Sequence, residues 1–427
     1  MYILIMVYFL VLLLEGAMSL EPIAEFGDFT ISYNLLMLVA INVIFMFRYL
    51  VKPFKLPFNN PIAWFYGTIF ITFIPVLLFK NHLALGGLSL LGQFFLQSMI
   101  ILVLFKSLRL KTMYNFTQFL GAFAFINCLI VYGSYYFPDT FKGIAEIHGY
   151  FGFNDDDPDR IKRVFGIMGD VAPWFLSFFA LHAIQMKKYF LGIFFGMTCA
   201  LGASIGATAL LLFGVYLHFF LSSLKKTHFF IRTLIFIVVI LGIILFYFPD
   251  MILNISVVKR LIDPSTFKSY SGAQRLFTFG LALDMINASP IWGNGYGTFL
   301  YNLQSSFGYQ FFNLKFEAGA LSNANNQFLQ ILYEGGIVLF TFFIFMIRHI
   351  FLIFNKYVQW SHKQSKMLEF KKSAFIWLIS LVLINQTAVW MIPSLLWLLI
   401  SSLIGISLYI NKNIHLFENI TLNSIPR

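Results

Sequence analysis

The segment SGAQRLFTFGLALDMINASPIWGNGYGTF occupies residues 271–299, and the segment SNANNQFLQILYEGG occupies residues 322–336. They fall in or beside a polar, aromatic and glycine-rich stretch, residues 250–326, in a chain otherwise dominated by apolar residues. A stretch of this length is too long to be a turn between packed helices, and loops of this kind are usually functional or disordered. Its many aromatic residues favour order. We therefore expect it to fold on a membrane surface and to carry the chemistry.

The composition indicates an integral membrane protein. Of the 427 residues, 59% are hydrophobic and only 11% are charged, whereas a soluble domain has about 25% charged residues. Membrane spans need about 20 residues each, so there is room for about a dozen. The net charge of +11 is explained by the Lys and Arg that orient spans toward the cytoplasm, so nucleic acid is not expected as a partner.

Apolar runs predict an all-α polytopic fold of about twelve transmembrane helices, because open strands cannot satisfy their backbone in lipid. The first run lacks a basic leader and a cleavage site, so we interpret it as a retained span. Gly202, Gly206 and Gly214 would permit close packing or a break in the least certain block, 171–221. The runs are 1–19, 31–51, 61–79, 83–105, 113–136, 171–186, 189–205, 206–221, 229–249, 327–347, 373–390 and 394–410.

The distribution of charge predicts the orientation. Most Lys and Arg residues fall in segments that are cytoplasmic if both termini are inside, and most acidic residues then lie outside. The chain divides into helices 1–5 (1–136), a first outer loop (137–170), helices 6–9 (171–249), a large outer catalytic loop (250–326), and helices 10–12 with a cytoplasmic tail (327–427). We expect short interfacial helices in the outer loops, including one over residues 271–286 whose apolar stripe ends before Pro290.

Arginines on the outer side are candidates for binding phosphate. Arg160 and Arg163 would share one face of a helical turn, and Arg275 opens the predicted interfacial helix. The planar guanidinium suits bidentate phosphate contacts. The alternatives are local pairing of the first two with the neighbouring aspartates, and for Arg275 a snorkelling role or pairing with Asp284.

The sequence GNGYG places glycines at 293, 295 and 297. A dinucleotide fingerprint would need a preceding strand and a following helix, and neither is predicted. A tight turn whose amides approach a ligand and a plain surface turn both remain open.

Amides and carboxylates surround the end of the loop. Asn325 and Asn326 could bond sugar hydroxyls or satisfy a helix N-terminus. Glu334 would be costly in hydrocarbon if unpaired, so it is a functional candidate, and Gly335–Gly336 would mark a local break. Glu317 and Asp284 are the loop acids placed to act as a general base. The chain's two cysteines, Cys128 and Cys199, lie in apolar runs and predict neither a disulfide nor a zinc site.

These pieces together resemble the O-antigen ligase/polymerase superfamily, which includes Wzy-type repeat-unit polymerases. The resemblance lies in the order of an arginine motif at Arg163, the helix-opening Arg275, the turn at 290–295, Asn325-Asn326-Gln-Phe-Leu329, and Glu334-Gly335-Gly336. One departure is Asn325, which stands where the ligases have histidine. Because asparagine cannot act as a general base, this favours a polymerase.

The resemblance implies a metal-independent glycosyl transfer without a cofactor, on the outer face of a bacterial cytoplasmic membrane. Donor and acceptor would be glycans on undecaprenyl diphosphate, as in lipopolysaccharide O-antigen assembly, and a chain-length regulator is a possible protein partner. Arg163 and Arg275 would hold the diphosphate, and Glu317 or Asp284 would accept the proton. Arg160, Gly293, Gly295, Tyr296, Asn325, Asn326 and Glu334 would contact substrate. A ligase of the same superfamily and a lipid-linked oligosaccharide flippase or transporter are the alternatives.

Overall fold

The computed structural model describes residues 1–18, 23–26, 29–49, 60–79, 81–137, 140–141, 171–201, 204–223, 270–296, 298–299, 326–360, 365–384 and 395–418. Within these ranges the chain is helical, apart from one short antiparallel hairpin in which β1 (Ala24–Phe26) pairs with β2 (Phe29–Ile31). The hairpin is an addition to the all-helical fold that the sequence predicts.

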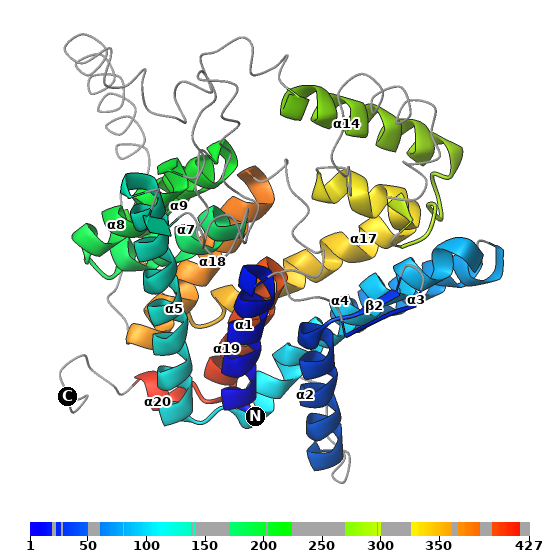
Figure 1. Cartoon of the computed structure of the whole chain (residues 1–427). Coiled ribbons are helices and arrows are strands. Elements are labelled where there is room, and N and C mark those ends of the chain that lie inside the picture. Colours follow the sequence, from blue (N-terminus) through cyan, green and yellow to red (C-terminus); the bar gives the residue numbers. More distant parts are fainter. Residues whose placement is uncertain are drawn as a thin grey trace.

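Each predicted apolar run contains one helix, except the run 229–249, which lies outside the described residues. The helix predicted over 271–286 is present as α14, and its interfacial position stays a prediction. The helices are α1 (Tyr2–Met18), α2 (Tyr33–Tyr49), α3 (Asn60–Phe79), α4 (Asn81–Ser107), α5 (Leu110–Tyr136), α7 (Ala172–Gln185), α8 (Tyr189–Leu201), α9 (Ile205–Ser222), α14 (Tyr270–Ala288), α17 (Gln327–Asn355), α18 (Lys366–Ile384), α19 (Leu395–Lys412) and α20 (His415–Glu418) (Figure 1).

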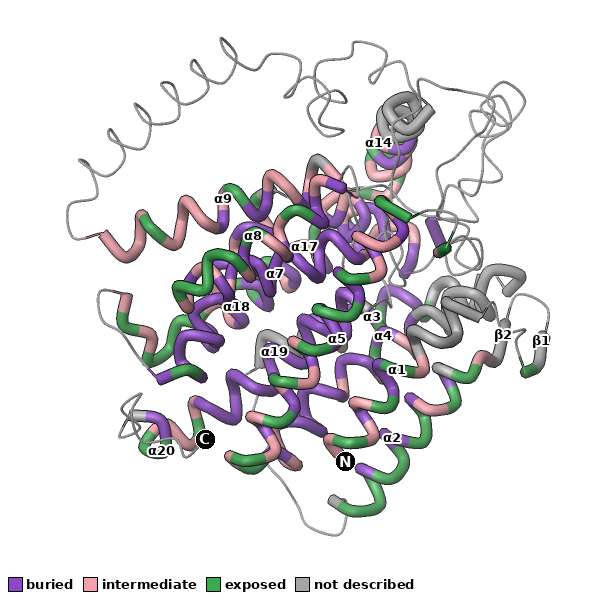
Figure 2. The backbone as a smooth tube through the Cα atoms, turned by 60° about the vertical axis from the view of Figure 1, so that its left-hand side comes forward, coloured by how far each residue is buried: buried purple, intermediate pink, exposed green. Residues whose placement is uncertain are grey.

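The helices have the length and surface of a membrane protein. Among the described residues, α5 and α17 are long and apolar enough to cross a membrane, and seven shorter apolar helices accompany them. Apolar side chains stay exposed on the outer helices, including Phe47 (78%) and Phe190 (86%), and Figure 2 shows such exposed positions along α2 and α8. Water would not favour this surface, whereas lipid does. These apolar helices and their exposed apolar side chains indicate an integral membrane protein.

The block 171–221 is built from three short helices. The 13 residues of α8 rise about 20 Å at 1.5 Å per residue, and the 14 residues of α7 rise about 21 Å. Both are shorter than the roughly 30 Å hydrocarbon layer. Gly214 permits close packing here, because a Cβ at this position would lie 3.3 Å from side-chain atoms of Leu181 and Ser380.

Helix α17 connects the parts of the bundle, since it packs against α3, α14, α18 and α19. The largest helix–helix contacts are between α4 and α19 and between α7 and α8. Gly405 brings α19 close to α4, because a Cβ at this position would lie 2.9 Å from the Cβ of Leu104. The Trp397 indole N–H donates to the Ser98 hydroxyl (3.0 Å) at the same interface.

Helix α18 extends beyond the apolar run 373–390. It already begins at Lys366, and both Lys371 and Lys372 are buried. The Lys371 ammonium donates to the carbonyl oxygen of Lys356, just past α17, and to the side-chain oxygen of Asn411 in α19. These acceptors explain how a lysine can be buried where three helices meet.

Candidate functional site

Helix α17 is interrupted about two and a half turns after it begins. Asn326 caps its N-terminus, where the side-chain oxygen accepts from the amides of Phe328 (2.9 Å) and Leu329 (3.0 Å). The backbone then leaves the helical conformation at Gly336, with φ 60° and ψ −162°. This is the break that the Gly335–Gly336 pair predicts, and Glu334 lies directly before it.

The 290–295 turn fills the break. In a continuous helix the amides of Ile337 and Val338 would bond the carbonyls of Tyr333 and Glu334. Instead, Ile337 N donates to Pro290 O (2.9 Å) and Val338 N to Ile291 O (3.4 Å).

The carbonyls released by the break are satisfied by the other end of the turn. Tyr333 O accepts from Asn294 N (2.8 Å), and Glu334 O accepts from Gly295 N (2.8 Å). The turn therefore replaces the two main-chain hydrogen bonds that a continuous helix would have here. All four main-chain groups at the break, two amides and two carbonyls, are paired with the turn.

Glycine is required at both contact points between turn and helix. Gly293 has φ +71° and Gly336 φ +60°, which is the left-handed region. A Cβ at Gly293 would lie 2.5 Å from the Glu334 carbonyl carbon, and one at Gly336 would lie 2.2 Å from Ile291 O. The close approach that these glycines permit is therefore between turn and helix.

The turn amides are occupied within the protein. Gly293 N bonds Ser289 O (3.0 Å), and the next two amides bond α17 as described. A substrate contact at Gly293 or Gly295 would therefore need other atoms of the turn. Pro290, Ile291 and Trp292 are the exposed residues of the turn, with Trp292 at 60%. Gly297 lies outside the described residues.

Side chains join the turn to α14 as well. The Asn294 side-chain amide donates to Met285 O in α14 (3.1 Å) and to Tyr333 O (3.4 Å). The Thr298 hydroxyl lies 2.8 Å from Gly295 O and 3.2 Å from the Tyr333 hydroxyl. Helix α14, the turn and the first part of α17 thus form one unit, which lies at the top of the molecule, opposite α20 (Figure 1).

Glu334 is held inside this unit. Its side chain is 4% exposed, and its Oε1 accepts from the side-chain amide of Gln330 (2.7 Å), one turn earlier in α17. Tyr296 is also buried, and its ring lies 6.0 Å from that of Phe94 in α4. Burial, with a contribution from the nearby Glu334 carboxylate, raises the pKa of Tyr296 well above its usual range. Its hydroxyl therefore stays protonated beside the carboxylate.

Helix α14 carries two of the predicted site positions, Arg275 and Asp284. Nine positions separate them, which corresponds to about 13.5 Å along the axis and roughly half a turn around it. The two positions therefore occupy opposite faces of α14. Asp284 is exposed, while Thr278 and Ala282 are buried on the packed side. Leu283 of the predicted apolar stripe is 51% exposed, as a lipid-facing position would be.

The remaining predicted positions divide into two groups. Arg160, Arg163, Glu317 and Asn325 lie outside the described residues, so their placement stays a prediction. Gly293, Gly295, Tyr296, Asn326 and Glu334 are brought together around the start of α17. Reasoning from the sequence missed Gln330, Tyr333, Asn294 and Thr298 as partners. A polar residue four positions before an intramembrane acid was the available signal for Gln330.

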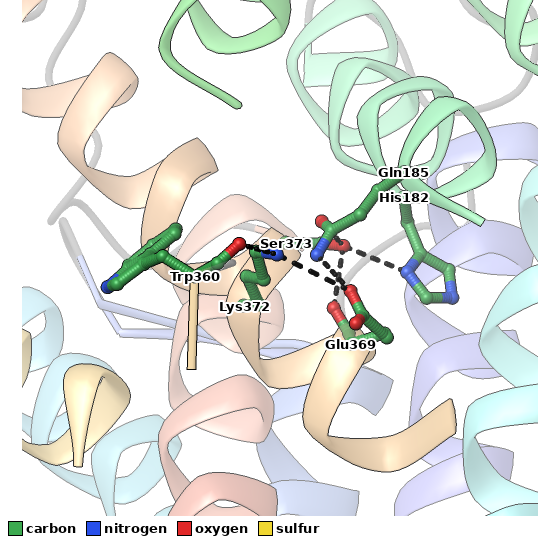
Figure 3. A network of polar contacts seen from close by, with 6 residues as sticks. All are labelled: His182, Gln185, Trp360, Glu369, Lys372 and Ser373. Carbon is green, nitrogen blue, oxygen red and sulfur yellow. Dashed lines mark hydrogen bonds and ion pairs between the residues drawn. The ribbon is translucent and has the colours of Figure 1, made fainter. Parts of the chain in front are cut away.

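A second polar network joins α7 to α18 (Figure 3). The Glu369 carboxylate accepts from the Gln185 side-chain amide (2.6 Å) and lies 3.9 Å from the Lys372 ammonium. The Ser373 hydroxyl bonds Gln185 Oε1 (2.5 Å) and lies 2.9 Å from His182 Nδ1. Every one of these groups has a protein partner, so this network holds the two helices together.

Comparison with known proteins points to the same part of the chain. Residues 190–344 match the family model described as O-antigen ligase. No curated protein is significantly similar to the chain. The match begins in α8, contains α14 and the 290–295 turn, and ends just after the break in α17. This match supports the resemblance of the chain to the O-antigen ligase/polymerase superfamily, whose members are glycan-transferring enzymes.

Proposed function

We propose that the protein polymerises undecaprenyl-diphosphate-linked oligosaccharide repeat units on the outer face of the bacterial cytoplasmic membrane. The observation that carries the proposal is the rigid unit of α14, turn and broken α17, inside the segment matched by the family model. This unit fixes the position of α14, the helix that bears Arg275, relative to the membrane-spanning helix α17. Asn325 in place of the ligase histidine favours polymerisation over ligation.

In the proposed reaction an acceptor sugar hydroxyl attacks the anomeric carbon of the donor glycan. The bond from that carbon to the diphosphate oxygen breaks, and its electron pair stays on the lipid diphosphate. Guanidinium groups of Arg163 and Arg275 stabilise the charge that develops there, without a metal ion. Asp284 or Glu317 accepts the hydroxyl proton.

Glu334 has a positioning role in this scheme. It is buried and bonded to Gln330, and its main-chain carbonyl holds Gly295 of the turn. The main-chain carbonyl thus helps to set where the turn lies, and the carboxylate stabilises the first part of α17 through Gln330.

Ligation is the second candidate, because the matching family model carries the description O-antigen ligase. A ligase would transfer the finished glycan to a different acceptor lipid. The pattern of surface glycan after deletion separates the two: loss of a polymerase leaves single repeat units attached, and loss of a ligase leaves none attached.

A flippase or transporter is disfavoured by the way the break in α17 is filled. Transporters use broken helices whose free main-chain groups bind the substrate or ion. Here the four groups at the break are bonded to the turn, so they are not available to a cargo.

The test is reconstitution with purified undecaprenyl-diphosphate repeat unit. The wild-type protein should give a ladder of products, and Arg275→Ala and Arg163→Ala should each reduce chain extension by about 100-fold or more. Arg275→Lys should also be impaired, because a point charge does not reproduce the planar fork. Long chains from both alanine variants at normal expression would overturn the assignment. Glu317→Gln and Asp284→Asn, assayed side by side, identify the base.

A further inference from the structure

A cavity of about 700 Å³ lies among α5, α7, α8 and α18, away from the 290–295 turn. Figure 1 shows α5 beside α7 and α8 on the side of the molecule away from α14. The cavity is lined along α5 from Lys111 to Phe125, a distance of about 21 Å at 1.5 Å per residue. That exceeds the roughly 15 Å depth of one leaflet's hydrocarbon.

The cavity lining is basic in one part and apolar in another. Three lysines contribute to it: Lys111 at the start of α5, Lys188 directly before α8, and Lys366 at the start of α18. Along α5, the lining continues from Lys111 through Tyr114, Gln118 and Gly121 to Phe125. Phe179, Leu191 and Phe195 provide apolar surface on α7 and α8. The cavity therefore combines a basic part with an apolar part.

The three lysines are suited to bind an anion. All three are exposed, and in the part of the chain that the structure describes none forms a salt bridge with a carboxylate. Glu369, the buried acid of the adjacent network, is already bonded to Gln185 and lies near Lys372. The sequence places all three lysines in segments predicted to face the same side of the membrane, where an anionic headgroup would sit.

We propose that this cavity binds an anionic phospholipid, with the phosphate among Lys111, Lys188 and Lys366 and one acyl chain along α5 toward Phe125. A free phosphate ion would use the basic part only and would leave the apolar wall exposed. A phospholipid satisfies both parts, because its acyl chain covers the aromatic surface. On the predicted topology the lysines face the cytoplasm, opposite the proposed glycan site, so this lipid is distinct from the lipid-linked substrate.

The first experiment measures lipid binding to the purified full-length protein by native mass spectrometry. Phosphatidylglycerol and phosphatidylcholine with the same acyl chains are compared. The wild-type protein should prefer phosphatidylglycerol. The triple variant Lys111→Gln, Lys188→Gln, Lys366→Gln should lose that preference, by roughly fivefold for each lysine removed. The matched control is Lys106→Gln, Lys187→Gln, Lys412→Gln, which removes the same charge from outside the cavity and should keep the preference.

The second experiment tests the acyl-chain part. A Cβ at Gly121 meets no atom within 4 Å, so Gly121→Leu fills the cavity without a clash and should lower phosphatidylglycerol binding about tenfold. Gly67→Leu on α3 is the control, because its Cβ also meets no atom within 4 Å and it does not line the cavity. Both variants should unfold thermally at the wild-type temperature.

Three results would overturn the proposal. One is a lysine triple variant that keeps the preference for phosphatidylglycerol, or a control variant that loses it to the same extent. Another is a Gly121→Leu variant that binds phosphatidylglycerol as strongly as the wild type. The third is displacement of phosphatidylglycerol by millimolar inorganic phosphate, which would indicate a simple anion site. None of these readouts involves glycan transfer, so the outcome is independent of the proposed function.

Discussion

The joint between α14 and α17 is made mainly by main-chain groups, whereas the joint between α7 and α18 is made by side chains. At the first, four main-chain hydrogen bonds pass between the 290–295 turn and the break in α17. At the second, Gln185, Glu369 and Ser373 bond through their side chains (Figure 3). Main-chain hydrogen bonds between the turn and α17 require the two backbones to approach closely, and therefore require glycine. Side-chain hydrogen bonds between α7 and α18 leave both helices regular.

This difference suggests a division of roles. A main-chain joint has few alternative geometries, so it restricts the position of α14, as the proposed glycan transfer would require. A side-chain joint stabilises the bundle and tolerates substitution better. Changes at the first joint should therefore affect glycan transfer and stability together, and changes at the second should affect stability alone.

The largest effect is expected from Gly336→Ala. A Cβ there would lie 2.2 Å from Ile291 O, and a backbone with φ 60° and ψ −162° is accessible to glycine almost alone. The expected loss is on the order of 3 kcal/mol of stability, with loss of chain extension. Thermal unfolding in detergent and the product ladder measure the two effects.

Gly67→Ala is the control for this substitution, because its Cβ meets no atom within 4 Å. If the Gly336→Ala protein unfolds at the same temperature as Gly67→Ala and still extends chains, the turn is not seated in the break as described.

An intermediate effect is expected from Gln330→Met. It removes the donor to the buried Glu334 carboxylate (2.7 Å) and should cost about 1–3 kcal/mol. Chain extension should fall as well, because Glu334 adjoins the turn. Gln118→Met on the exposed side of α5 is the control. Equal unfolding temperatures for the two variants would show that Glu334 does not depend on Gln330.

The smallest effect is expected from Ser373→Ala, at the side-chain joint. It removes the bond to Gln185 and the contact with His182 and should cost about 1 kcal/mol, with chain extension unchanged. Thr341→Ala, whose hydroxyl bonds a carbonyl of its own helix at an exposed position, is the comparison. A large loss of glycan product from Ser373→Ala would contradict the division of roles.

Hydropathy located the helices well, because lipid leaves a spanning segment little choice but to bond its backbone internally. Glu334 and the glycine pair after it were also recognisable, since an intramembrane acid and a Gly-Gly step are both unusual inside a span. Helix α18 begins seven residues before the apolar run that starts at 373. There Lys371 is buried against Lys356 and Asn411. Acceptors on other helices cannot be deduced from local composition.

The sequence by itself determined that this is a helical membrane protein with a polar stretch at 250–326 and a glycine turn at 290–295, because composition and turn chemistry are local properties. Only the tertiary structure decided where that turn goes. Its amides and carbonyls fill a break in a helix that begins some thirty residues later. In the same way, only the fold brings Lys111, Lys188 and Lys366 around one cavity. Such pairings depend on how helices cross, and no single segment encodes that.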